Sequence, residues 1–134
     1  MKKVRAIIEK SADGMFSIFM DAEEMPYLVT GTGSTVAEAI EKFEGGYADI
    51  REYFVSEGKA FEEVEFDYIY DVASFLQHYA YAFSLAGLER ITGVNQKQLG
   101  HYISGYRKPS KKTIRKIELS IKEFSKELSS VQFA

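Results

Sequence analysis

Residues 84–110, SLAGLERITGVNQKQLGHYISGYRKPS, contain the pattern that decides the fold of the second half of the chain. Ser84 and Asn95 each precede a segment with helical spacing, and Gly93 and Gly105 each follow one. Ser and Asn accept hydrogen bonds from the free N–H groups at a helix start, and Gly tolerates the positive φ at which many helices end. The stretch therefore predicts two short helices, over residues 85–92 and 96–104, joined by a tight turn.

The apolar side chains of this stretch are spaced to form one core, shared by two helices that we expect to cross roughly at a right angle. They are Leu88, Ile91, Val94, Leu99 and either Tyr102 or Ile103. Positions repeating every three or four residues then form the exposed face of the second helix, namely Gln96, Lys97, Gly100, His101 and Ser104. Gly100 either lets this helix approach DNA closely or permits contact with a neighbouring helix.

The exposed side chains of the second helix suit the major groove of DNA. A Gln side chain such as Gln96 bonds adenine at N6 and N7, and a Lys such as Lys97 donates to N7 and O6 of guanine. Donors for phosphate oxygens follow in the sequence at Tyr106, Arg107, Lys108, Lys111 and Lys112. Lys111 and Lys112 begin the last helix, where positive charge opposes the helix dipole, so helix stability does not account for them. The alternative is a solvated basic loop that happens to precede a helix.

Residues 84–110 resemble the helix-turn-helix of XRE and lambda-repressor-like proteins, and the similarity continues to about residue 128. The resemblance implies that Gln96, Lys97 and His101 read bases. It also places three residues near the DNA backbone, namely Ser104, Tyr106 and Arg107.

One position departs from that family. Glu89 stands where a small residue usually packs against the second helix. We therefore expect its side chain to lean outward or to pair with Arg90 or Lys97.

The last helix is expected to begin after Ser110, because Ser110 follows Pro109 and precedes apolar residues spaced by three and four. These are Ile114, Ile117, Ile121, Phe124 and Leu128. An earlier helix is expected over residues 72–83, with Asp71 as its cap. The second half thus predicts an all-α bundle of about four short helices, in which an uncovered apolar strip would serve a dimer.

The first half predicts a small α+β unit of the order β-β-β-α-β. Strands are expected over residues 3–9, 15–20, 27–30 and 64–70, with an Asp13-Gly14 turn between the first two. Thr35 and Glu38 fit a capping box for an amphipathic helix that ends near Gly58. Because no Gly/Ser or Pro run separates the halves, we place the boundary near residue 70, which gives domains 1–70 and 71–134.

The N-terminal half resembles the HicB antitoxin domain in its element order, its Thr-Gly-Thr-Gly-Ser-Thr run at 30–35 and its Val-Ala-Glu-Ala-Ile at 36–40. That domain has a partial RNase H-like fold and is often followed by a DNA-binding module, so the similarity covers nearly the whole chain. The resemblance implies that residues 1–70 bind and block a small HicA-like RNA-cleaving toxin. It implies that residues 71–134 repress the operon.

Charge is divided unequally along the chain, whose net charge is −3. Residues 1–70 hold 7 basic and 15 acidic side chains, a net of −8, and residues 71–134 hold 10 basic and 5 acidic ones, a net of +5. This asymmetry predicts two partners, double-stranded DNA for the basic half and a basic protein for the acidic half. The alternative is ordinary variation between two surfaces.

The sequence offers little for catalysis or metal binding. It contains no Cys, which excludes a thiolate zinc site and a Cys nucleophile, and its only His residues are His78 and His101. The acids available to an RNase H-like metal site are Asp13, Asp21, Glu38 and Asp49, and they show no paired-carboxylate spacing. Gly31-x-Gly33 fits a tight strand-to-helix turn better than a phosphate cradle. We expect no enzymatic activity, catalytic residue, metal or cofactor.

The first residues, MKKVRAIIEK, lack the pattern of an export signal, and no run approaches the roughly twenty apolar residues that a membrane span needs. We therefore expect a cytoplasmic HicB-type repressor that forms a homodimer or a higher even oligomer. Two alternatives stay open: a solitary transcriptional regulator without a toxin, and a protein-interaction module that does not bind DNA.

Overall fold

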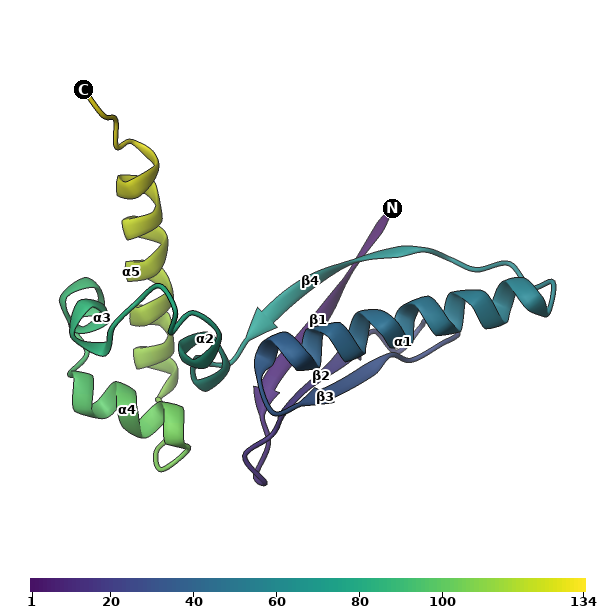
Figure 1. Cartoon of the computed structure of the whole chain (residues 1–134), viewed down its shortest axis with the longest axis horizontal. Coiled ribbons are helices and arrows are strands. Elements are labelled where there is room, and N and C mark those ends of the chain that lie inside the picture. The colour runs from purple at the N-terminus through teal and green to yellow at the C-terminus, as the bar shows by residue number, and fades with distance from the viewer. The chain divides into compact units, whose positions relative to one another are not determined.

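The chain follows the order β1–β2–β3–α1–β4–α2–α3–α4–α5 in a computed structural model that describes residues 1–134 (Figure 1). It divides into two units, Met1–His78 and Tyr79–Ala134. The first unit is α+β, as predicted, and the second contains three helices.

The first unit begins with an antiparallel hairpin of β1 (Lys2–Lys10) and β2 (Phe16–Asp21), in which Ile8 lies opposite Ile18. The turn forms at the predicted Asp-Gly pair. Gly14 has φ 85°, and the Met15 N–H donates to Asp13 Oδ1 at 2.9 Å. The positive φ explains why Gly occupies this position.

Strand β3 (Thr30–Gly33) pairs with β2 and begins where the predicted strand ends, so the prediction of residues 27–30 was wrong. The two glycines lie in this strand rather than in a turn after it. A Cβ at Gly31 would lie 2.6 Å from Phe43 N, and a Cβ at Gly33 would lie 2.6 Å from Ala39 N. Both glycines therefore let the strand pack directly on the backbone of the following helix.

Helix α1 (Val36–Ser56) starts as the sequence indicates, because Thr35 Oγ1 accepts a hydrogen bond from Glu38 N at 3.1 Å. The reciprocal hydrogen bond of the capping box, from the Thr35 N–H to the Glu38 side chain, is replaced by another contact. The Glu38 carboxylate accepts from the Ser34 hydroxyl at 3.2 Å, and no bond to the Thr35 N–H forms. One face of α1 lies on the sheet, and the core between them includes Ala6, Ile8, Val29, Val36, Ala39 and Phe43, all at 0 % exposure.

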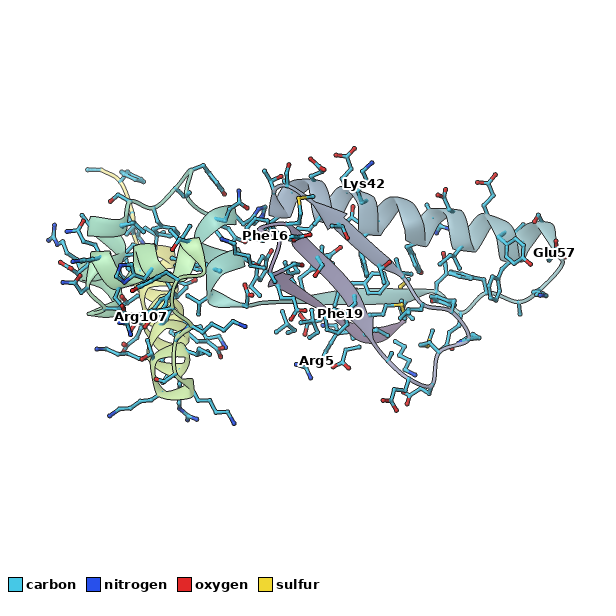
Figure 2. All side chains as sticks on the ribbon, turned by 90° about the horizontal axis from the view of Figure 1, so that it is seen from below. Arg5, Phe16, Phe19, Lys42, Glu57 and Arg107 are labelled. Carbon is cyan, nitrogen blue, oxygen red and sulfur yellow. The ribbon has the colours of Figure 1, made fainter.

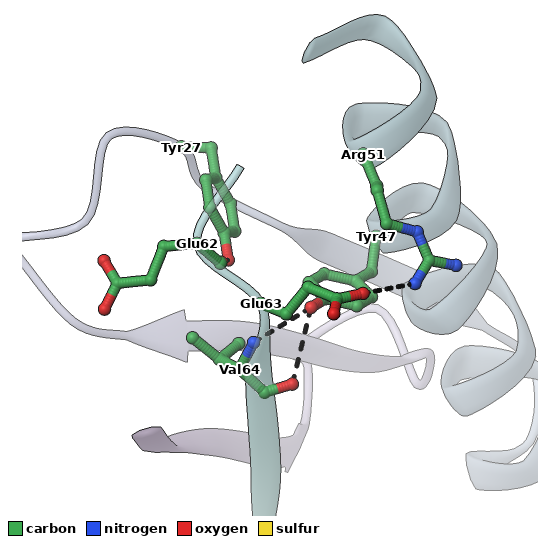
Figure 3. Close-up of polar contacts among 6 residues, drawn as sticks. All are labelled: Tyr27, Tyr47, Arg51, Glu62, Glu63 and Val64. Carbon is green, nitrogen blue, oxygen red and sulfur yellow. Dashed lines mark hydrogen bonds and ion pairs between the residues drawn. The ribbon is translucent and has the colours of Figure 1, made fainter. Parts of the chain in front are cut away.

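Strand β4 (Val64–Tyr70) runs parallel to β1 and completes a mixed sheet of order β3-β2-β1-β4. Its entry is held by the hydroxyl of Tyr47, which accepts from Val64 N at 3.0 Å, and by an Arg51–Glu63 ion pair at 2.8 Å (Figure 3). Tyr27 donates to the Glu62 carbonyl at 2.6 Å. Burial, followed by the neighbouring Tyr47, raises the pKa of Tyr27 to about 12.

Helix α2 (Val72–His78) is shorter than the predicted 72–83 helix, because Ala82 N and Phe83 N both bond Tyr79 O in a separate turn. Asp71 caps it as predicted, accepting from Ser74 N at 2.7 Å, and also accepts from Lys10 N at 2.9 Å. This helix belongs to the first unit. The units therefore divide after residue 78, whereas the sequence placed the boundary near residue 70.

The second unit consists of α3 (Leu85–Thr92), α4 (Gln96–Ser104) and α5 (Lys111–Ser129). All three begin as predicted, since Ser84, Asn95 and Ser110 each accept a hydrogen bond from the first turn. Gly93 and Gly105 end α3 and α4 with φ of 73° and 80°. The buried side chains of this unit are Leu88, Thr92, Val94, Leu99, Tyr102 and Ile117. Four predicted core positions, Leu88, Val94, Leu99 and Tyr102, are thus confirmed, whereas Ile91 and Ile103 are only half-buried.

Candidate nucleic-acid interface

The turn between α3 and α4 is closed by local hydrogen bonds. The Gly93 N–H donates to Glu89 O at 2.8 Å, and the Val94 N–H donates to the Thr92 hydroxyl at 3.1 Å. That hydroxyl donates in turn to Leu88 O at 2.7 Å. Because each group is satisfied inside the unit, the turn fixes where α4 starts relative to α3.

The Glu89 side chain corrects the expectation from the sequence. It neither leans outward nor pairs with Arg90 or Lys97; instead its Oε1 accepts a hydrogen bond from Gln96 N at 2.8 Å. Asn95 Oδ1 accepts from the next amide, Lys97 N, at 2.8 Å. Two N–H groups that the start of α4 leaves free are thus satisfied, one of them from α3.

The first turn of α4 presents two free side chains. Gln96 and Lys97 are exposed, and neither side chain has a hydrogen-bond or ion-pair partner. Their backbone amides are the ones held by Glu89 and Asn95, so the backbone is fixed while the side chains remain available. This arrangement suits recognition of an external partner.

His101 differs from these two residues, because it is half-buried beside an aromatic ring. Its ring lies edge-to-face with Tyr106 at 4.9 Å between centroids, and its Nδ1 lies 3.4 Å from Gln98 Oε1. The Arg107 guanidinium stands 5.6 Å from the Tyr106 ring centre. His101 and Arg107 therefore both contact Tyr106 at the end of α4.

The Ser104 side chain forms hydrogen bonds with the backbone at the end of α4. Its hydroxyl donates to His101 O at 3.1 Å and accepts from Tyr106 N at 3.3 Å. It thereby positions the exposed Tyr106, which is 71 % accessible.

Gly100 lies against α3. A Cβ at this position would be 3.8 Å from Leu85 Cδ1, an ordinary van der Waals distance, and the residue is half-buried. Of the two interpretations of Gly100, the contact with a neighbouring helix is the one that this geometry supports.

Cations gather at the start of α5 and in the loop before it. Arg107, Lys108, Lys111 and Lys112 are all exposed. The loop between α4 and α5 carries the first two (Figure 1), and Figure 2 labels Arg107. Two further cations, Arg115 and Lys116, lie one turn after Lys111 and Lys112 and were not among the expected phosphate contacts. The spacing of four residues was the signal that would have identified them. Lys116 reaches the turn, since a Cβ at Gly93 would lie 3.3 Å from its Nζ.

Charge is polarised along α5. The four cations at 111, 112, 115 and 116 precede its first acid, Glu118, and the other two acids are Glu123 and Glu127. Residues 79–134 carry 10 basic and 4 acidic side chains, a net of +6, while residues 1–78 carry 7 basic and 16 acidic ones, a net of −9. The positive charge of the second unit is therefore concentrated near α4, and this patch of Arg107, Lys108, Lys111, Lys112, Arg115 and Lys116 is named the basic patch below.

Three of the four acids considered for an RNase H-like metal site have structural partners. Asp13 accepts from the Met15 amide, Asp21 pairs with Arg5 at 3.4 Å, and Glu38 accepts from Ser34. No group of three or more His, Asp or Glu side chains is arranged to hold a metal ion.

Comparison with known proteins finds no matching family model, no matching curated protein and no matching solved structure. None of the five helices combines the length and the apolar character needed to cross a bilayer.

Proposed function

We propose that this chain is a sequence-specific DNA-binding transcriptional repressor of the HicB antitoxin type, in which α3 and α4 form a helix-turn-helix. The observation that carries the proposal is the pair of exposed, unpaired side chains at the start of α4, Gln96 and Lys97, beside the basic patch. Helix α4 enters the major groove, where Gln96, Lys97 and His101 read base edges.

Contacts to the DNA backbone come from the residues that follow the recognition helix. They are Ser104, Tyr106, Arg107, Lys108, Lys111 and Lys112, to which the basic patch adds Arg115 and Lys116. Phosphate contacts hold the protein in register and release counterions, so affinity falls as salt rises. Ser104 acts through Tyr106, whose amide it holds.

The active form is a homodimer or a higher even oligomer that binds two half-sites about one helical turn apart. Exposed apolar side chains on α5 support an interface between copies, since Ile114, Leu119 and Leu128 are 41 %, 55 % and 57 % accessible. Burial of such side chains would favour association.

The acidic first unit neutralises a HicA-like RNA-cleaving toxin by binding it. Its net charge of −9 supports this role, because a protein that binds RNA presents a basic surface. No catalytic step and no cofactor are assigned to this chain.

Selection of duplexes from a random DNA pool tests the DNA-binding role. The full chain is expected to enrich one sequence, and Gln96→Ala and Lys97→Ala are each expected to lose about 1–3 kcal/mol of discrimination at one base position. Gln132→Ala and Lys126→Ala are the matched controls, since they remove the same residue types from exposed positions outside the recognition helix. Failure to enrich any sequence, or equal effects of all four variants, would contradict the role as a repressor and favour a protein-interaction module that does not bind DNA.

A further inference from the structure

The face of the sheet that points away from α1 has a regular pattern. Along β1, Val4, Ala6 and Ile8 are buried towards α1, so Lys3, Arg5, Ile7 and Glu9 point to the other face. The register of the four strands then places Ile69 beside Ile7, Ile7 beside Phe19, and Phe19 beside Thr30. These residues form a row across the sheet, named the central row below.

The central row is largely apolar and accessible. Phe19 is 37 % exposed, and Ile7 and Ile69 are half-buried. Figure 2 labels Phe19 and Arg5 on the strands of this face. Fully buried core side chains in the same strands, such as Ile8 and Ile18, lie on the opposite face at 0 % and 1 % exposure.

Charged side chains, most of them acidic, flank the central row. On one side Arg5 lies between Asp21 and Asp67 in the register, followed by Lys3 beside Glu65; on the other side lies Glu9. Arg5 pairs with Asp21 at 3.4 Å, whereas Glu9, Glu65 and Asp67 have no ion-pair partner. The face thus has four acids against two bases, and three of the acids are free.

The solvent side of α1 is also acidic but has a different composition. Glu41 and Glu52 are exposed there and without partners, yet the large exposed apolar side chains of α1, Tyr53 and Val55, occur only near its end. Specific interfaces bury an apolar or aromatic centre within a polar rim. The sheet face has that arrangement and most of α1 does not.

We infer that the outward sheet face, with Phe19 as its anchor, is the surface on which the first unit binds a basic protein. The inference rests on the proposed function, which gives this unit a basic protein partner. Apolar side chains of the partner cover the central row, and its Lys or Arg side chains pair with Glu9, Glu65 and Asp67. A second copy of this chain fits less well, because each face has a net charge of −2 on a unit of net charge −9.

Photocrosslinking in the cells that produce the protein tests the surface, with p-benzoylphenylalanine placed at Phe19 or, as the matched control, at Tyr53 in the full chain. The Phe19 probe is expected to capture one protein of high isoelectric point, identified by mass spectrometry, and the Tyr53 probe is not. Neutralising two free acids on β4 of the same face (Glu65→Gln with Asp67→Asn) is expected to lower that yield by about fivefold. The charge-matched control, Glu41→Gln with Glu52→Gln, is expected to change the yield by less than about twofold.

The remaining outcomes separate the surface from the function. Capture of a basic protein by the Tyr53 probe alone overturns the assignment of the sheet face as the binding surface and leaves the antitoxin role in place. Capture of a second copy, or of an acidic protein, through Phe19 overturns the partner assigned here. Capture of nothing by either probe overturns both the surface and the toxin-binding role, in favour of a solitary regulator whose operator binding is measured separately.

Discussion

The Glu89 carboxylate on α3 accepts a hydrogen bond from the Gln96 backbone N–H at the start of α4, at 2.8 Å. The contact ties α4 to α3 at the residue proposed to read a base. An acid at this position is therefore compatible with the proposed helix-turn-helix, because it caps α4 instead of separating the two helices.

Loss of this acceptor is expected to loosen the start of α4. Glu89→Ala should lower the unfolding free energy of the second unit by about 1–2 kcal/mol and speed hydrogen exchange at the Gln96 amide. Glu89→Gln, which keeps an oxygen acceptor, should lose less than half as much. Arg90→Ala is the control; an equal loss in that variant would favour a Glu89–Arg90 pair over the cap.

Two glycines of the first unit are expected to respond oppositely to Ala. Gly31→Ala places a Cβ 2.6 Å from Phe43 N and 2.7 Å from Ala39 O, both backbone atoms, and should cost about 3 kcal/mol or more. Gly45→Ala lies within α1 with nothing within 4 Å and should stabilise the unit by up to about 1 kcal/mol. Denaturant unfolding measures both, and similar small effects would show that β3 does not pack on the backbone of α1.

Gly100→Ala distinguishes packing from DNA approach. Its Cβ would make an ordinary contact with Leu85, so the variant should gain up to about 1 kcal/mol in helix stability. Its affinity for the selected duplex should stay within about twofold of the wild type, because the position faces α3. A loss of tenfold or more in affinity, with stability unchanged, would place Gly100 against the DNA.

The Tyr27 hydroxyl makes stability depend on pH above 10. Tyr27→Phe removes the bond to Glu62 O and should cost about 1 kcal/mol at pH 7. Burial raises the pKa of the folded Tyr27 from 10.0 to about 12, so between these values the unfolded chain releases a proton that the folded chain retains. The wild type therefore loses stability as the pH rises from 10 to 12. The Tyr27→Phe variant lacks this contribution to the pH dependence of its unfolding free energy. Unfolding measured at pH 7, 10 and 11 should show the gap between the two proteins narrowing; a constant gap would mean that the folded hydroxyl titrates normally.

Features encoded by neighbouring residues were predictable from the sequence. Ser84, Asn95 and Ser110 cap their own helices, and Gly93 adopts the positive φ of the turn between α3 and α4. Each of these effects depends on a few adjacent residues, so a single sequence contains the information.

Features that depend on distant residues were not predictable in the same way. The strand at 30–33 is set by contact of Gly31 with α1, and the place of α2 in the first unit is set by Asp71 and Gln77, which bond Lys10 N and Val36 N. The partner of Glu89 lies seven residues along the chain, across a turn. Among the site residues, the exposed Gln96 side chain without a partner and the edge-to-face contact between His101 and Tyr106 likewise depend on the three-dimensional structure.

The salt dependence of operator binding tests the central claim most directly. Affinity for the selected duplex would be measured by fluorescence anisotropy at several salt concentrations for the wild type, for Lys111→Ala with Lys112→Ala, and for Lys122→Ala with Lys126→Ala. The first pair should reduce the slope of log affinity against log salt by about 2, since each lost phosphate contact removes about 0.9. The second pair lies further along α5 beyond the basic patch and should leave the slope within about 0.5 of the wild type. Equal slopes for all three proteins would contradict binding of DNA through α4 and the basic patch.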